Sequence, residues 1–149
     1  LAIAYREQGC VGFDLAGEEA GHPAAEHLKA FQFVKRQNFA ITIHAGESFG
    51  PESIWQALQY CGAHRIGHGT RLIEDLAIHQ GQVIKVGTLA QYLLDHRVPI
   101  EICLSSNVHT GAARSLSEHP FGLYKRLGYR LTLNTDNRLM SNTTLSEEY

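Results

Sequence analysis

Short apolar runs alternate along this chain with segments whose apolar residues recur every three or four positions. The runs predict strands at 10–15, 39–44, 64–68, 100–104 and 129–134. The helical spacing predicts helices that begin near Pro23 and Pro51, and further helices at 88–96 and 120–127. Because parallel neighbours need a long crossover connection, this alternation predicts an α/β fold with a parallel sheet. In the second strand only Ala40 and Thr42 separate Phe39, Ile41 and Ile43, which predicts that both of its faces are covered.

Polar residues follow each predicted strand at its carboxyl end. The clearest case is 41–47, where the apolar run stops at His44 and Glu47 follows two small residues later. The other strand ends carry Asp14 and Gly17, His68, residues 105–107, and Asp136 with Asn137. Open α/β sheets and (β/α)₈ barrels both build their sites at this edge. We therefore expect these residues to form one site at the carboxyl edge of the sheet. The lack of a glycine-rich fingerprint after the first strand disfavours dinucleotide binding there.

Composition narrows the function classes. The 149 residues, 44% hydrophobic and 19% charged, are expected to form a single domain over 1–149. A formal charge of −2 gives no electrostatic reason to expect nucleic acid or an anionic membrane as partner. No apolar run approaches the ~20 residues of a membrane span. Three cysteines without CxxC spacing suit a reducing compartment, so a cytoplasmic protein is expected.

Both ends of the sequence look like cuts in a longer protein. The chain opens at Leu1 in patterned material. At the other end, residues 141–144 resemble a helix cap, and the sequence stops within about two turns, too short a helix to be stable alone. We therefore expect an incomplete catalytic domain.

The strand-end residues suggest metal chemistry. A neutral imidazole at His44 suits zinc, and Glu47 is placed to face the same cavity without binding the metal. Asp136 is suited both to bind a metal and to accept a proton. Each has a structural alternative: a hydrogen-bonded loop pair for His44 and Glu47, a cap or turn for Asp136, and a backbone-bonded core histidine for His68.

Other candidates carry weaker signals. Asp14 is explained equally well as a loop cap, and Gly17 as a turn residue. Residues 105–107 offer neutral donors that also suit a loop. The other histidines are expected on the solvated surface, and His109 is the one nearest to a strand end: His22, His27, His64, His79, His96, His109 and His119.

Five ordered motifs resemble the adenosine deaminase family over nearly the whole chain. They read GFDLAGEE at 12–19, TIHAGE at 42–47, RIGHG at 65–69, SSN at 105–107 and LNTD at 133–136. The resemblance implies a zinc-bearing TIM (β/α)₈ barrel, of which these five strand–helix units would be the fourth to eighth. A barrel of that kind typically needs ~250 residues. The family's first strand carries a His-x-His pair of zinc ligands, which this sequence lacks, so the resemblance leaves His44 and Asp136 as the metal ligands present.

The resemblance also implies a reaction and a role for each residue. A zinc-activated water would deaminate adenosine or deoxyadenosine to inosine or deoxyinosine and ammonia, with Glu47 protonating purine N1. His68 would orient or deprotonate the water, and Asp136 would share its proton. For the substrate, Gly17 would offer its backbone N–H to ring N3. Asn137 stands where many members carry an aspartate that bonds ring N7, and an amide can donate there without being protonated.

Two alternatives stay open. One is another metal-dependent hydrolase of the same superfamily, such as a deaminase of adenine or another aminopurine. A protonating carboxylate at Glu47 suits a purine nitrogen better than a phosphoester. The other is an inactive binding fragment, because five parallel strands alone leave two open edges and an exposed inner face.

Overall fold

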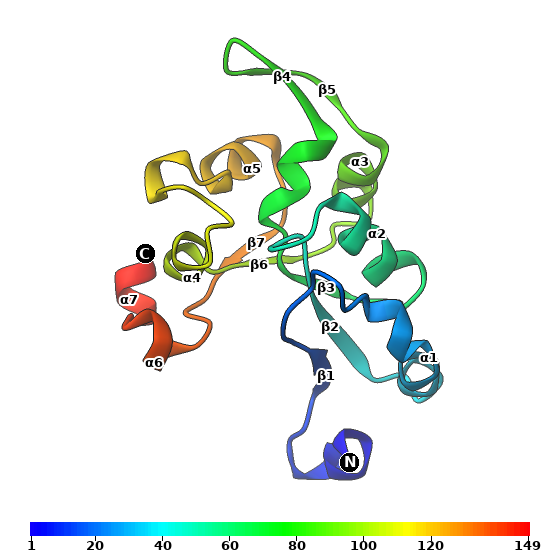
Figure 1. The fold of residues 1–149 in the computed structure, drawn as a ribbon. Coiled ribbons are helices and arrows are strands. Elements are labelled where there is room, and N and C mark those ends of the chain that lie inside the picture. The colour runs from blue at the N-terminus through cyan, green and yellow to red at the C-terminus, as the bar shows by residue number, and fades with distance from the viewer.

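A five-stranded parallel sheet forms the centre of the chain in a computed structural model that describes all 149 residues (Figure 1). Its strands lie in the order β1-β2-β3-β6-β7, and every neighbouring pair is parallel. Their bounds are Gly12–Leu15 for β1, Ala40–Ala45 for β2, Arg65–His68 for β3, Ile100–Ile102 for β6 and Leu131–Leu133 for β7. The five predicted strands and the parallel sheet are therefore confirmed.

Helices connect these strands as the sequence predicts. The α-helices are α1 (Leu28–Arg36), α2 (Pro51–Gln59), α3 (Thr88–Asp95), α4 (Leu104–His109), α5 (Phe121–Leu127), α6 (Arg138–Ser141) and α7 (Leu145–Glu148). Short 3₁₀ helices are η1 (Ala2–Gln8), η2 (Ala24–His27), η3 (Thr70–Asp75) and η4 (Leu116–Glu118). The helix predicted near Pro23 thus begins as a 3₁₀ turn. None of the helices is long and apolar enough to cross a lipid bilayer.

One face of the sheet carries the hydrophobic core. Five isoleucines on three neighbouring strands are fully buried: Ile41, Ile43, Ile66, Ile100 and Ile102. They pack in one cluster with apolar side chains of the helices, including Phe31 of α1, Ile54 of α2, Leu93 of α3 and Tyr124 of α5. Burial of such side chains contributes about 1.5–3 kcal/mol each, which makes this face the main source of stability.

The opposite face of the same sheet is polar, which corrects one expectation. We predicted that β2 is covered on both faces, but burial alternates along it: Ile41 and Ile43 are buried while Thr42 and His44 are only half-buried. Arg65 of β3 and Glu101 of β6 form an ion pair on neighbouring strands. Thr42 and His44 therefore remain partly accessible to solvent on this side of β2.

Two elements differ from the expectation. The chain between η3 and α3 forms an antiparallel hairpin of β4 (Leu76–His79) and β5 (Gln82–Val86), which projects from the body at the top of Figure 1. Its two turn residues, Gln80 and Gly81, both have positive φ, as a tight hairpin requires. In addition, residues 105–107 lie inside α4 rather than in a loop.

The predicted cap near the carboxyl end is confirmed. The Thr144 hydroxyl accepts a hydrogen bond from the Glu147 backbone N–H, and the Glu147 carboxylate accepts one from the Thr144 N–H. This reciprocal pair is a capping box, and it begins α7.

Candidate active site

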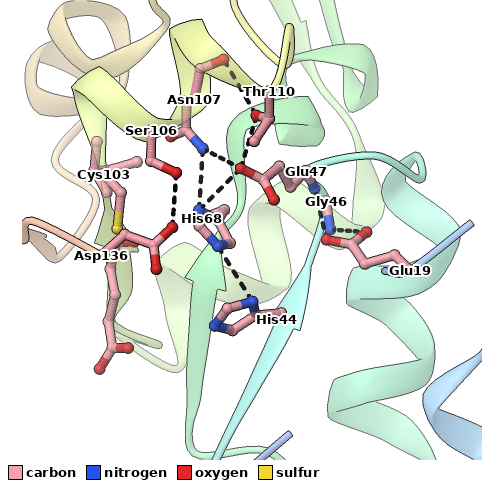
Figure 2. Close-up of polar contacts among 12 residues, drawn as sticks. Glu19, His44, Gly46, Glu47, His68, Cys103, Ser106, Asn107, Thr110 and Asp136 are labelled. Carbon is pink, nitrogen blue, oxygen red and sulfur yellow. Dashed lines mark hydrogen bonds and ion pairs between the residues drawn. The ribbon is translucent and has the colours of Figure 1, made fainter. Parts of the chain in front are cut away.

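The carboxyl ends of β2 and β3 bring two histidines into contact. His44 lies one residue before the end of β2, and His68 is the last residue of β3 (Figure 2). Nε2 of His68 lies 3.3 Å from Nδ1 of His44, and the two rings are nearly perpendicular. Gly67 makes room for this contact, because a Cβ there would lie 2.9 Å from the His44 ring.

Glu47 approaches His68 from the loop after β2. Its Oε1 lies 3.4 Å from Nδ1 of His68. The same oxygen accepts hydrogen bonds of 2.9 Å from the Asn107 amide and 2.9 Å from the Thr110 hydroxyl. Both donors lie at the end of α4, so residues 60 and 63 positions away in sequence hold Glu47 against His68.

A buried carboxylate that sequence reasoning missed organises the Glu47 loop. Glu19 accepts backbone N–H hydrogen bonds from Gly46, Glu47 and Phe49, and a further one from the Ser53 hydroxyl. Several N–H groups converging on one anion form a nest that fixes the loop backbone. Gly46 has a φ of 73°, and a Cβ there would meet Ile54 at 2.5 Å, so only glycine fits. The signal was present, since Glu19 lies inside the 12–19 motif.

Asp136 approaches the group from the end of β7. Its Oδ2 accepts a 2.7 Å hydrogen bond from the Ser106 hydroxyl of α4. Its φ of 54° is in the left-handed region, which is uncommon for aspartate and is often found at functional sites. Possible ligand atoms of Asp136, His68 and Cys103 all lie within 4.8 Å of one another. The predicted metal residue Asp136 is therefore grouped directly with His68, and His44 contacts the Nε2 nitrogen of the same His68 ring.

The donors gathered here, the imidazoles of His44 and His68 and the carboxylate of Asp136, are of the types that fit a divalent cation such as zinc. Burial, with the neighbouring His44 charge, lowers the pKa of His68 to about 4, so its imidazole is neutral at pH 7. Neutral imidazole and carboxylate are ligands that zinc prefers. Cys103 is the poorest donor of the group, because burial, together with the Asp136 and Glu47 carboxylates, raises the pKa of its thiol to about 12. Its thiol instead donates to the Glu101 backbone oxygen.

The two predicted substrate residues lie in different surroundings. Gly17 and His44 line one cavity of about 650 Å³, together with Leu15, His22, Phe49 and Gln56. Asn137 does not line it; its Oδ1 accepts from the backbone N–H groups of Leu139 and Met140 and so caps α6. The structure therefore brings Gly17, and not Asn137, into the cavity beside His44. The Asn137 amide nitrogen has no partner within the chain.

Most of the remaining histidines are exposed as expected, with one exception. His109 is exposed at the end of α4, whereas its neighbours Asn107 and Thr110 contact Glu47. His119, which we expected on the surface, is buried, and its Nε2 lies 3.2 Å from Oδ1 of Asn107. That burial results from the packing of η4 and its flanking chain against α4, which no local pattern reveals.

Comparisons with known proteins agree with this geometry. The profile of the adenosine deaminase family matches residues 1–149. Adenosine deaminase 1 of Streptomyces coelicolor is 58% identical over 149 residues, which cover all of this chain and 38% of that protein. Adenosine deaminase of Mycobacterium sp. (strain JLS) is 53% identical over 148 residues, 99% of this chain and 41% of that protein.

Solved structures agree with the sequence relatives. The N6-methyl-AMP deaminase of Arabidopsis thaliana superposes with a TM-score of 0.80 and 32% identity over 99% of this chain and 40% of its own. This confirms the fold as five strand–helix units of a (β/α)₈ barrel. The chain spans about two-fifths of the length of the curated relatives it matches. By its motifs, its fold and its matched length, the chain belongs to the adenosine deaminase family.

Proposed function

We propose that this chain supplies part of the active site of a hydrolytic adenosine deaminase. The reaction converts adenosine or deoxyadenosine and water into inosine or deoxyinosine and ammonia. The observation that carries the proposal is the contact of Glu47 and His44 with opposite nitrogens of His68, beside Asp136. This places a proton donor, a proton acceptor and metal-binding groups around one point, as deamination of a purine requires.

Zinc is the cofactor of this proposal, held by His44 and Asp136 with further ligands from outside these 149 residues. His68 contacts Nδ1 of His44, and Nε2 of His44 has no hydrogen-bond partner within the chain. A bound zinc ion supplies Lewis-acid activation of water at neutral pH. The cytoplasmic location is also proposed, and the three free cysteines support it.

The chain's own residues supply the proton transfers and the orientation of the purine. Glu47 gives a proton to ring N1, which makes C6 more electrophilic. The neutral His68 imidazole orients the attacking water or accepts a proton from it, and Asp136 shares that role. Gly17 offers its backbone N–H to ring N3 from the cavity wall. The free amide nitrogen of Asn137 donates to ring N7, while its oxygen holds α6.

The isolated 149 residues are proposed to lack useful turnover. The inner face of the sheet is half-exposed around His44, and a catalytic zinc normally needs about three protein ligands. We therefore define a hybrid for testing, in which the residues of Streptomyces coelicolor adenosine deaminase 1 that lie outside its matched region are joined to Leu1 and to Tyr149. The 58% identity over the matched region favours correct docking of the two parts.

The hybrid and the isolated chain are assayed with adenosine, deoxyadenosine, adenine and N6-methyl-AMP, and zinc is measured by elemental analysis. We expect adenosine turnover by the hybrid only, with about one zinc per chain, and loss of both zinc and turnover in His44→Ala. The matched control is His109→Ala, an exposed histidine outside the site. Strong turnover by the isolated chain would contradict its proposed inactivity. Preference for another aminopurine would contradict adenosine as the substrate, and full zinc occupancy in His44→Ala would contradict ligation by His44.

A further inference from the structure

The two carboxylate oxygens of Glu47 have different surroundings. Oε1 accepts from the Asn107 amide and the Thr110 hydroxyl, each at 2.9 Å, and faces His68 at 3.4 Å. Oε2 has no hydrogen-bond partner within the chain, and it is not among the buried atoms that lack one. Oε2 therefore faces open space next to the histidines (Figure 2).

A second layer of hydrogen bonds determines which way the Asn107 amide points. Asn107 is fully buried, and its Oδ1 lies 3.2 Å from Nε2 of His119. Nδ1 of His119 accepts a 3.0 Å hydrogen bond from the Phe121 backbone N–H. A neutral imidazole that accepts at Nδ1 carries its hydrogen on Nε2. His119 therefore donates to Oδ1, and the Asn107 amide nitrogen must face Glu47 and His68.

These hydrogen bonds all donate in the same direction, from the Phe121 N–H to His119, from His119 to Asn107, and from Asn107 to Glu47. Burial lowers the pKa of His119 to about 4, so the ring stays neutral at pH 7 and keeps this direction. Two donors aimed at Oε1 leave no room for a hydrogen on that oxygen. When Glu47 is protonated, its hydrogen must lie on Oε2.

We propose that Asn107 and Thr110 are positioning residues that reserve Oε1 as an acceptor and make Oε2 the oxygen from which the proton is given. This inference depends on the proposed deaminase function. In the step, the O–H bond of Oε2 breaks, the lone pair of a ring nitrogen forms the new N–H bond, and a carboxylate remains. Hydrogen bonds to a charged carboxylate are about twice as strong as those to the neutral acid. The two donors therefore stabilise the state after proton transfer more than the state before it.

Such differential stabilisation acts on kcat rather than on KM. Thr110 allows a clean test because it lies exposed at the end of α4, where substitution does not disturb the core. Thr110→Val in the hybrid keeps the shape but removes the hydroxyl, and should lower kcat for adenosine about tenfold with KM changed less than about twofold. Thr110→Ser restores the donor, and its kcat should lie within about twofold of the unsubstituted hybrid.

Histidine NMR of the ¹⁵N-labelled hybrid gives a readout independent of turnover, with hydrogen expected on Nε2 of His119 at pH 7. Hydrogen on Nδ1, or full kcat in Thr110→Val, would overturn the inference and leave the deaminase proposal standing. Equal losses in Thr110→Val and Thr110→Ser would show that the hydroxyl is not the active feature, and would overturn it as well. A hybrid that turns over no adenosine would instead overturn the proposed function, and with it the proton-donor role of Glu47.

Discussion

The two faces of β2 differ in burial and in polarity. Ile41 and Ile43 point to one side and are fully buried, while Thr42 and His44 alternate with them on the other side and remain half-buried. Because successive side chains of a strand point to opposite faces, one residue step separates the core from the candidate site. Residues of this one strand thus alternate between the hydrophobic core, which stabilises the fold, and the candidate site.

The two faces are also held by different forces. The core face depends on apolar burial, which is non-directional and needs only residues of the right size. The site face depends on hydrogen bonds between specific atoms, such as those from Gly46 to Glu19 and from Asn107 to Glu47. A substitution on the core face should therefore change mainly the unfolding free energy, and a substitution on the site face should change mainly turnover.

The largest expected effect is on the site face. Glu47→Gln in the hybrid keeps the side-chain shape but removes the proton that the carboxyl group gives. We expect kcat to fall about 10²- to 10⁴-fold while zinc content and unfolding free energy stay unchanged. Glu52→Gln on the exposed side of α2 is the matched control. Turnover within about tenfold of the unsubstituted hybrid would remove Glu47 from its assigned role.

The next effect belongs to the core face. Ile43→Ala removes three carbons from a fully buried position, and should cost about 2–5 kcal/mol of unfolding free energy through lost burial and the cavity left behind. Thr42→Ala, one residue away on the half-buried face, should cost less than about 1 kcal/mol. Urea unfolding of both hybrids measures the difference. Equal losses of unfolding free energy in the two variants would contradict the difference between the two faces.

Acid sensitivity tests the buried polar layer behind the site. The pKa of His119 falls from an ordinary 6.5 to about 4 in the fold, so the folded state favours the neutral ring. The stabilisation is present above pH 6.5 and is lost as pH falls from 6.5 toward 4. By linkage, His119 should account for about 2 kcal/mol of the unfolding free energy lost between pH 7 and pH 5, beside a similar share from His68. His119→Gln should reduce this loss in urea unfolding at the two pH values, and an unchanged loss would rule out His119 as its source.

The smallest effect concerns the backbone of the Glu47 loop. Glu19→Gln keeps one carboxyl oxygen but replaces the other with a donor that faces backbone N–H groups. We expect a loss of about tenfold in kcat, with KM less affected, because positioning partners of site residues typically have effects of that size. Glu26→Gln alters an exposed carboxylate that does not line the cavity and serves as control. If the two variants behave alike, the nest is not what places Glu47.

Much of the fold was predictable because its signals are local. The apolar runs at 39–44 and 100–104 and the proline at Pro51 act within a few residues, and the observed elements follow them. The hairpin at 76–86 was missed because its turn, Gln80 and Gly81, lacks the usual Asn-Gly signal and its strands are mostly exposed. The α4 helix was missed because Ser105, Ser106 and Asn107 read as loop residues by composition.

The sequence by itself determined which residues stand at the strand ends, because strand periodicity places His44, His68 and Asp136 there without any distant partner. Only the tertiary structure decided what each of them contacts. Asn107 and Thr110 lie about 60 residues from Glu47, and Glu19 lies 27 residues from Gly46. Hydrogen bonds over such separations depend on how whole elements pack, and no pattern along the chain records that.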